Sequence, residues 1–97
     1  METYKAHETA VIDPGCTIGD GTHIWHFSHI MPGCSIGRNC NIGQNVVISP
    51  LVVLGNNVKV QNNVSVYTGV ECGMQLITDV VDKNKALCQN KEFDYII

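Results

Sequence analysis

An aliphatic residue returns at every sixth position along most of this 97-residue chain. The series comprises Ile12, Ile18, Ile24, Ile30, Ile36, Ile42, Ile48, Leu54, Val60 and Val66. Neither an α-helix, with its period of 3.6, nor a strand, with its period of 2, produces such a spacing. A second series of small or β-branched residues runs two positions ahead, and Gly or Asn fills eight of the ten positions that lie three after an aliphatic. Since Gly and Asn tolerate positive φ, each hexad predicts a short strand followed by a corner.

Repeats of this length are typical of a solenoid in which every side of a coil is one short strand. Residue type recurs most clearly at a spacing of eighteen, as in Pro14, Pro32 and Pro50 and in Gly19, Gly37, Gly55 and Gly73. Three hexads therefore close one coil, which predicts an all-β, triangular parallel β-helix of about four coils. We expect residues 1–77 to form this domain, with the repeat frame continuing through Leu76. Residues 78–97 are expected to be a tail, either a short helix that caps the last coil or a mobile segment.

Charge and hydropathy exclude several classes of partner. The formal net charge is −3 with only six Lys and Arg residues, so nucleic acid and anionic membranes are not expected as partners. No apolar run reaches the length of a membrane span, and the first ten residues lack the apolar core of a signal peptide. We therefore expect a soluble cytoplasmic protein. Open strand edges at the ends of the solenoid favour self-association.

Three of the five cysteines occupy the small inward series, at Cys16, Cys34 and Cys40. They are interpreted as core-filling residues. Cys16 and Cys34 lie eighteen apart and so stack in adjacent coils, which is close enough in principle for a disulfide. In a reducing compartment we expect free thiols instead. No Cys or Cys/His spacing typical of a metal site occurs.

The hexad IWHFSH at residues 24–29 departs most from the repeat, because Phe27 replaces the corner Gly or Asn. Trp25 and Phe27 could fill a groove between subunits or wall a ligand pocket, and both hold if sites lie between chains. His23, His26 and His29 are spaced three apart and should fan outward around a corner, so a metal site within one chain is not expected. His26 is the best catalytic candidate, since an imidazole could orient a substrate or accept its proton.

Amide side chains accumulate in and around the column that His26 begins. Amides suit a ligand with hydroxyl, phosphate or uracil-like groups, because they offer both donors and acceptors without charge. Alternatively, they form turns and amide ladders within the solenoid, which is the better interpretation for Asn45 and Asn63. The predicted substrate-binding residues are Trp25, His26, Gln44, Gln61, Asn62, Asn63 and Tyr67.

The segments HETAVID, IGDGTHIWHFSHI, IGQNVVI and VKVQNNVSVYTGV resemble the left-handed β-helix, hexapeptide-repeat acyltransferases. The resemblance covers about residues 5–72 and is strongest to bacterial sugar-nucleotide 3-amino N-acetyltransferases of surface-polysaccharide, including lipopolysaccharide, biosynthesis. It implies a left-handed coil and a homotrimer with sites between subunits. It also implies acetyl transfer from acetyl-CoA to an amino group on a UDP-linked sugar, with no metal.

Two features depart from that family and keep alternatives open. The chain is shorter, and after Val70 one hexad and a proline of the family pattern are missing. The coils that bind coenzyme A in the family have no counterpart in residues 80–97. A non-catalytic trimeric β-helix module is therefore the alternative to an acetyltransferase. A metal-dependent, carbonic-anhydrase-like hydratase is a third and weaker interpretation.

Overall fold

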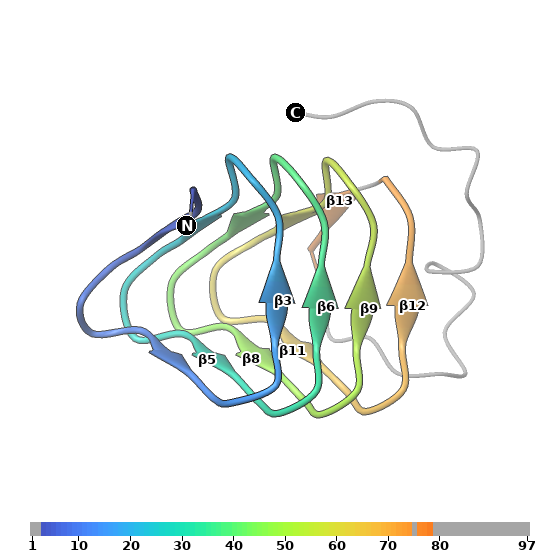
Figure 1. Cartoon of the computed structure of the whole chain (residues 1–97), viewed down its shortest axis with the longest axis horizontal. Coiled ribbons are helices and arrows are strands. Elements are labelled where there is room, and N and C mark those ends of the chain that lie inside the picture. The colour runs from blue at the N-terminus through green and yellow to red at the C-terminus, as the bar shows by residue number, and fades with distance from the viewer. Residues whose placement is uncertain (1–2, 75, 79–97) are drawn as a thin grey trace.

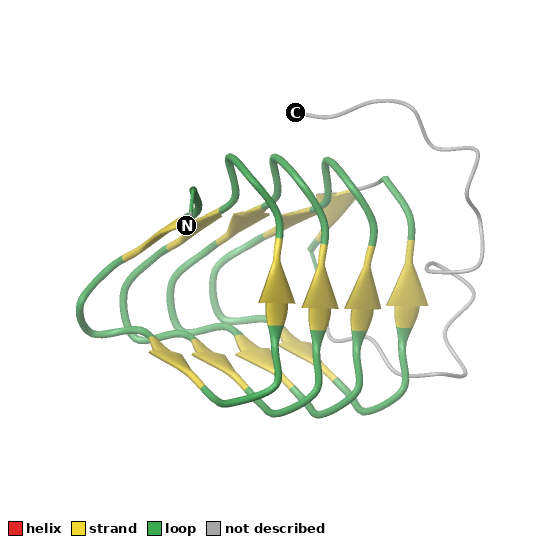
Figure 2. Cartoon of the chain, in the orientation of Figure 1, coloured by secondary structure: helices red, strands yellow, loops and turns green. Residues whose placement is uncertain are grey.

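A computed structural model describes residues 3–74 and 76–78, and within these residues the chain consists of strands joined by turns (Figure 2). Each strand is two residues long. In chain order they are β1 (Lys5–Ala6), β2 (Val11–Ile12), β3 (Thr17–Ile18), β4 (His23–Ile24), β5 (His29–Ile30), β6 (Ser35–Ile36), β7 (Asn41–Ile42), β8 (Val47–Ile48), β9 (Val53–Leu54), β10 (Lys59–Val60), β11 (Ser65–Val66), β12 (Glu71–Cys72) and β13 (Leu76–Ile77). No segment of the described residues forms an apolar helix of membrane-spanning length.

The strands form three parallel sheets, one on each side of a triangular coil (Figure 1). Sheet A has the order β1-β4-β7-β10-β13, sheet B the order β11-β8-β5-β2 and sheet C the order β12-β9-β6-β3. Except at β13, paired residues are eighteen apart in the sequence, as in the pairing of His23 with Asn41 and of Val11 with His29. The fold is the left-handed parallel β-helix of about four coils that the six-residue repeat predicts.

The core is built from the two inward series. In the second to fourth coils the last residue of each strand is at most 4% exposed, from Ile24 at 0% to Cys72 at 4%. The small series fills the space beside the corners, with Val46, Val52 and Val58 fully buried. A large aliphatic on the flat side and a small residue beside each corner are what a triangular cross-section can hold at close packing.

Polar members of the small series satisfy their own hydrogen bonds. The buried hydroxyls of Thr22 and Ser28 donate to the carbonyls of Gly37 and Gly43, each fifteen residues further on. The free thiols of Cys16, Cys34 and Cys40 donate in the same way, to the carbonyls of Met31, Ser49 and Gly55. This common geometry explains how Cys, Ser and Thr share one core series, since a buried polar group must be paired.

The corners require positive φ, as the Gly and Asn pattern predicts. Asn39, Asn45, Asn57 and Asn63 have φ between 54° and 65°. Two bulky residues adopt the same conformation, Phe27 at 59° and Leu51 at 64°, and each remains 63% exposed. The neighbouring coils hold these two residues at positive φ, which is a strained backbone conformation for residues of this type.

The repeat frame loses one residue in the last coil, so the expectation that it continues through Leu76 is wrong. β13 pairs with β10 at a spacing of seventeen, with Lys59 opposite Leu76 and Val60 opposite Ile77. Leu76 consequently faces outward, and Ile77 takes the fully buried inward place. Burying Ile77 rather than Thr78 removes more apolar surface from water, which favours the shift. The predicted tail, residues 78–97, lies almost entirely outside the described residues.

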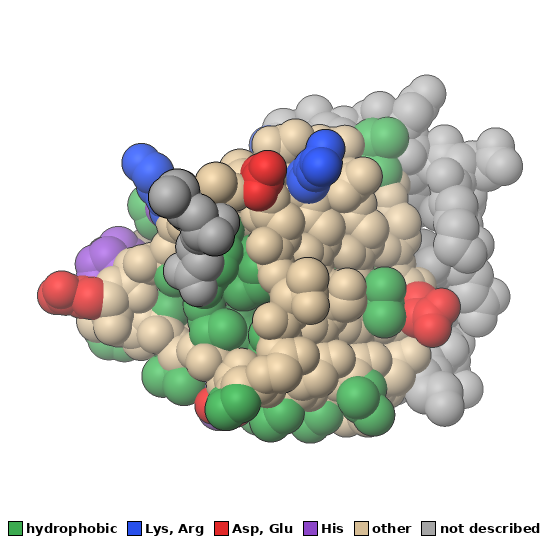
Figure 3. All heavy atoms as spheres, in the orientation of Figure 1, with side chains coloured by type: hydrophobic (Ala, Val, Ile, Leu, Met, Phe, Trp, Pro, Cys, Tyr) green, Lys and Arg blue, Asp and Glu red, His purple; other side chains and the backbone are tan. Residues whose placement is uncertain are grey.

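Sheet C carries a column of glycines whose backbones lie close together. A Cβ at Gly19 would come within 2.7 Å of the backbone of Gly37, and a Cβ at Gly37 equally close to that of Gly55. Figure 3 views this side of the molecule, where uncharged polar and backbone atoms predominate between the strands. Glycine is thus required here for the spacing of the coils rather than for a special φ.

Candidate functional site

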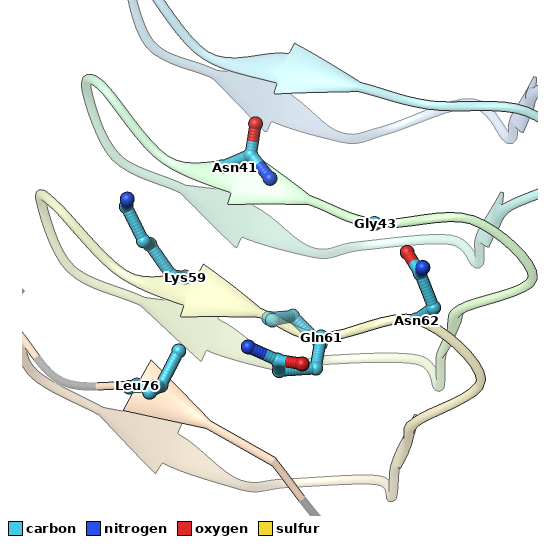
Figure 4. A pocket seen from close by; sticks show the side chains of 7 residues that line it. Asn41, Gly43, Lys59, Gln61, Asn62 and Leu76 are labelled. Atoms are coloured by element: carbon cyan, nitrogen blue, oxygen red, sulfur yellow. The ribbon is translucent and has the colours of Figure 1, made fainter. Parts of the chain in front are cut away.

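The outer surface of sheet A is hollowed around Gly43, at the end of β7 (Figure 4). One hollow of about 260 Å³ is lined by Asn41, Gly43, Lys59, Val60, Gln61, Asn62 and Leu76. A second, of about 300 Å³, adjoins it and is lined by Trp25, Asn41, Gly43, Gln44 and Asn62. Because Asn41, Gly43 and Asn62 line both, the two hollows form one elongated site, which we call the Gly43 site.

Gly43 lines both hollows. Its position in the coil corresponds to that of Trp25 in the coil before and of Gln61 in the coil after, both of which project from the sheet. A Cβ at Gly43 would clash with Oδ1 of Asn62 and would lie 3.0 Å from both the backbone nitrogen of Asn62 and the carbonyl oxygen of Val60. The absence of a side chain at Gly43 therefore lets the carboxamide of Asn62 lie directly against this turn.

Trp25 forms one wall and is held in a fixed orientation. Its indole Nε1 donates a hydrogen bond of 2.9 Å to Oδ1 of Asn41. The ring of His23 stacks on it, with centroids 4.0 Å apart and planes 6° from parallel. A tryptophan fixed by both a hydrogen bond and a stack is a preorganised surface for a ligand.

His26 lies at the corner between sheets A and B, beside this wall. Its ring stacks on that of His7 with centroids 3.6 Å apart. The position of His7 is fixed by Thr9, whose hydroxyl lies 2.9 Å from Nδ1 of His7 and accepts the amide of Phe27 at 3.0 Å. Nδ1 of His26 is buried and has no hydrogen-bond partner among the described residues. In the neutral ring the proton is therefore best placed on Nε2, which makes His26 a donor at that atom.

The predicted amides divide into two groups. Asn63, like Asn45, is a corner residue with positive φ, and its backbone amide donates to the carbonyl of Gln44. Asn62 lines the site but also serves the turn, because its Oδ1 accepts the backbone amide of Gln44 at 2.8 Å. Gln44 and Gln61 line the site through exposed side chains.

Two of the singled-out residues lie elsewhere. Tyr67 follows β11 on sheet B, around the corner from the Gly43 site, and lines neither hollow. His29 also belongs to sheet B, where its Nε2 lies 2.8 Å from Oδ2 of Asp13. The spacing argument that separated His23, His26 and His29 is thus correct for His29. Among the described residues no group of three potential metal ligands comes together.

Five lining residues were not predicted, namely Asn41, Gly43, Lys59, Val60 and Leu76. Asn41 and Lys59 occupy the outward position of their strands, which the repeat leaves unconstrained. A comparison of residues eighteen apart would have found the signal, since Gly43 is the small residue between Trp25 and Gln61. Leu76 could not be found in this way, because it reaches the site only through the lost residue in the last coil.

The fold and this site define a hexapeptide-repeat parallel β-helix with a groove on one sheet. Residues 15–50 match the family described as bacterial transferase hexapeptide (six repeats). Residues 33–68 match the hexapeptide repeat of succinyl-transferase. Within residues 15–68 the repeat of this chain is therefore similar to the hexapeptide repeats of these two families.

Two solved structures are similar to this chain at low sequence identity. The acetyltransferase domain of PglB from Neisseria gonorrhoeae, in complex with acetyl coenzyme A, is 15% identical, with a TM-score of 0.46 over 84% of this chain and 49% of that one. PerB from Caulobacter crescentus, in complex with CoA and GDP-perosamine, is 17% identical, with a TM-score of 0.41 over 78% of this chain and 49% of that one. The chain thus spans about half the length of these structures. No curated protein matches it significantly.

Proposed function

We propose that this chain is a hexapeptide-repeat acyltransferase that acetylates an amino group of a nucleotide-linked sugar, with acetyl-CoA as the donor. The observation that carries the proposal is the Gly43 site, which joins a fixed indole to a row of amide side chains on a transferase-type repeat. Such a surface offers a planar ring something to stack on and sugar hydroxyls something to bond. A role in surface-polysaccharide synthesis follows from the segments quoted above, such as QNNVSVY.

The main requirement of the reaction is that the protein align the amine with the thioester. The lone pair of the amine attacks the thioester carbonyl carbon, the carbon–sulfur bond breaks, and the nitrogen loses a proton as the thiolate leaves. Alignment of the two substrates supplies much of the rate in such a step. His26 suits an orienting role better than that of a base. To accept a proton at Nε2, the neutral ring would have to carry its own proton on Nδ1, and that N–H would be buried without an acceptor.

We propose further that the active unit is a cytoplasmic homotrimer with the Gly43 site near the boundary between subunits. The site adjoins the corner that carries Phe27, a large apolar residue that is 63% exposed at positive φ. Exposed aromatics of this kind are enriched at interfaces. Analytical ultracentrifugation at micromolar concentration is expected to give a trimer, and a monomer would contradict this part of the proposal.

The direct test incubates the purified chain with acetyl-CoA and UDP-2-acetamido-3-amino-2,3-dideoxyglucuronate and follows the N-acetylated product by mass spectrometry. Wild-type protein is expected to form product, and Trp25→Phe, which removes the indole donor to Asn41, to form it more slowly. Tyr67→Phe is the matched control, because Tyr67 lines neither hollow. Binding of the sugar nucleotide without product would identify a non-catalytic binding module instead.

A further inference from the structure

The orientation of the Asn41 carboxamide is fixed by its partner. The indole Nε1–H of Trp25 can only donate, so the Asn41 atom 2.9 Å away must be the oxygen. The Asn41 amino group is then the half that remains for other contacts. Asn41 therefore offers the Gly43 site two donors, its acceptor being engaged by Trp25.

The same reasoning fixes the amide of Asn62, on the other side of Gly43. Its Oδ1 accepts the backbone N–H of Gln44 at 2.8 Å, and a backbone N–H can only donate. The equivalent turn one corner earlier has the same bond, from the backbone of Arg38 to Oδ1 of Asn56. The oxygen of Asn62 also lies against Gly43. Of the two amides that line both hollows, Asn41 is therefore the one whose amino group is offered to the site.

A positive charge adds to these donors. Lys59 lines the hollow at the outward position of β10, between Asn41 and Leu76 in the two adjacent coils, and its side chain extends away from Gln61 and Asn62 (Figure 4). Neither neighbour is acidic, and no carboxylate of the described residues pairs with Lys59. The ion pair that the described residues do form, between Asp13 and His29, lies on sheet B. The Lys59 ammonium thus lacks a counter-ion within the described chain.

The outer surface of sheet A is cationic although the whole chain carries a formal charge of −3. Its outward strand positions are occupied by Lys5, His23, Asn41, Lys59 and Leu76, without a single acid. Uncompensated donors and a positive charge in one concave site attract an anion rich in acceptor oxygens.

From this arrangement we propose that the Gly43 site binds an oxyanion of its ligand, with Lys59 as the charge and the amino group of Asn41 as the donor. The inference rests on the proposed function and adds to it a specificity-determining residue. In a sugar nucleotide, two groups have the required chemistry, the diphosphate and the carboxylate of a uronic acid sugar. Both are recognised through acceptor oxygens and negative charge, which Lys59 and the amino group of Asn41 complement.

The experiment measures binding by isothermal titration calorimetry to wild-type protein, Lys59→Met and Asn41→Asp. Lys59→Met removes the charge while keeping an apolar chain of similar length. Asn41→Asp keeps the oxygen that accepts from Trp25 but replaces the donors with a negative charge. Lys5→Met is the control, because it removes a lysine from the same sheet outside both hollows. Thermal unfolding of each variant verifies that the fold is intact.

The probes separate the two sources of the anion. They are uridine, UDP, inorganic pyrophosphate, UDP-N-acetylglucosamine and its uronic acid counterpart. We expect Lys59→Met to weaken UDP about 10- to 100-fold, the range of one charge-assisted hydrogen bond, and to leave uridine unchanged. If Lys59→Met weakens binding of the uronic acid counterpart but not of UDP-N-acetylglucosamine, the carboxylate is the group bound by Lys59 instead. For wild-type protein, raising the ionic strength to about 0.5 M should weaken the binding of the same ligands.

Failure of this inference is distinguishable from failure of the proposed function. If UDP and the uronic acid bind Lys59→Met as tightly as wild-type protein, the oxyanion role is refuted while sugar-nucleotide binding stands. A different result would be that Lys59→Met weakens pyrophosphate binding, while wild-type protein binds UDP no more tightly than pyrophosphate. The oxyanion site would then be supported and the sugar-nucleotide function contradicted. Absence of binding by every anion to wild-type protein would overturn the inference.

Discussion

Replacing Gly37 by Ala tests whether the glycine column on sheet C sets the spacing between coils. An added Cβ would lie 2.7 Å from the carbonyl carbon and 2.7 Å from the carbonyl oxygen of Gly55. These are backbone atoms of the next coil, so they cannot rotate away as a flexible side chain would. The coils must separate locally, which stretches the hydrogen bond between the amide of Gly37 and the carbonyl of Leu54, now 2.9 Å.

The magnitude follows from two opposing terms. Forcing an extra methyl group into a close-packed contact costs about 1–3 kcal/mol. The loss of backbone freedom in the unfolded chain returns about 0.4–1 kcal/mol, since Gly37 does not need positive φ. We expect a net destabilisation of about 1–2 kcal/mol, and each kcal/mol lowers the melting temperature of a domain this small by about 4–8 °C.

Gly55→Ala in the same column is the matched control. Its Cβ would lie 3.6 Å from the carbonyl oxygen of Cys72 and 3.7 Å from Cα of Gly73, which are ordinary contacts. Only the entropic gain should then remain, so this variant is expected to be as stable as wild-type protein or slightly more stable. Urea unfolding followed by circular dichroism measures both. Equal destabilisation by the two substitutions would refute the spacing argument.

Three further predictions concern the corners, the core and the site. Leu51→Asn should stabilise the chain by about 1 kcal/mol in thermal unfolding, because Asn tolerates the φ of 64°; destabilisation would mean that Leu51 is buried in the assembly. Burial raises the pKa of the Cys34 and Cys40 thiols above the ordinary 9.0, so the folded chain holds these protons more tightly than the unfolded chain. Their contribution to the free energy of unfolding is present below pH 9.0 and lost as the pH rises through the raised values, an effect that Cys40→Val should reduce. Gly43→Ala should lower both sugar-nucleotide binding in calorimetry and stability in urea unfolding, since its Cβ would clash with Oδ1 of Asn62 and lie 3.0 Å from backbone atoms of the next coil.

The fold could be predicted because its determinants are local and repeated. Each hexad carries both its inward aliphatic and its corner residue, so the sequence at one corner predicts the geometry of all. Phe27 and Leu51 break the corner pattern but still adopt positive φ, since the coils on either side fix the backbone between them. The spacing of seventeen instead of eighteen before Ile77 was not predicted. Whether Ile77 or Thr78 points inward depends on which side chain the last coil can bury.

The site was predicted only in part, for a physical reason. Trp25, Gln44, Gln61 and Asn62 stand out because they are unusual at their positions, and all four line the Gly43 site. Outward strand positions accept almost any residue, so Lys59 carries no signal of its own in the sequence. Its importance comes from what is missing around it, a side chain at Gly43 and an acid among its neighbours.

The sequence posed turn formation and ligand binding as alternative roles for the amides, but Asn62 has the geometry for both. Its oxygen closes the turn by accepting from Gln44 and lies against Gly43, while the residue lines both hollows. The oxygen of Asn41 is likewise engaged, with Trp25 as its donor. At Asn41 this internal bond leaves the amino group as the half that is available to a ligand. The requirement that the β-helix satisfy its own polar groups thereby gives the Gly43 site its preference for an anion, before Lys59 adds a charge.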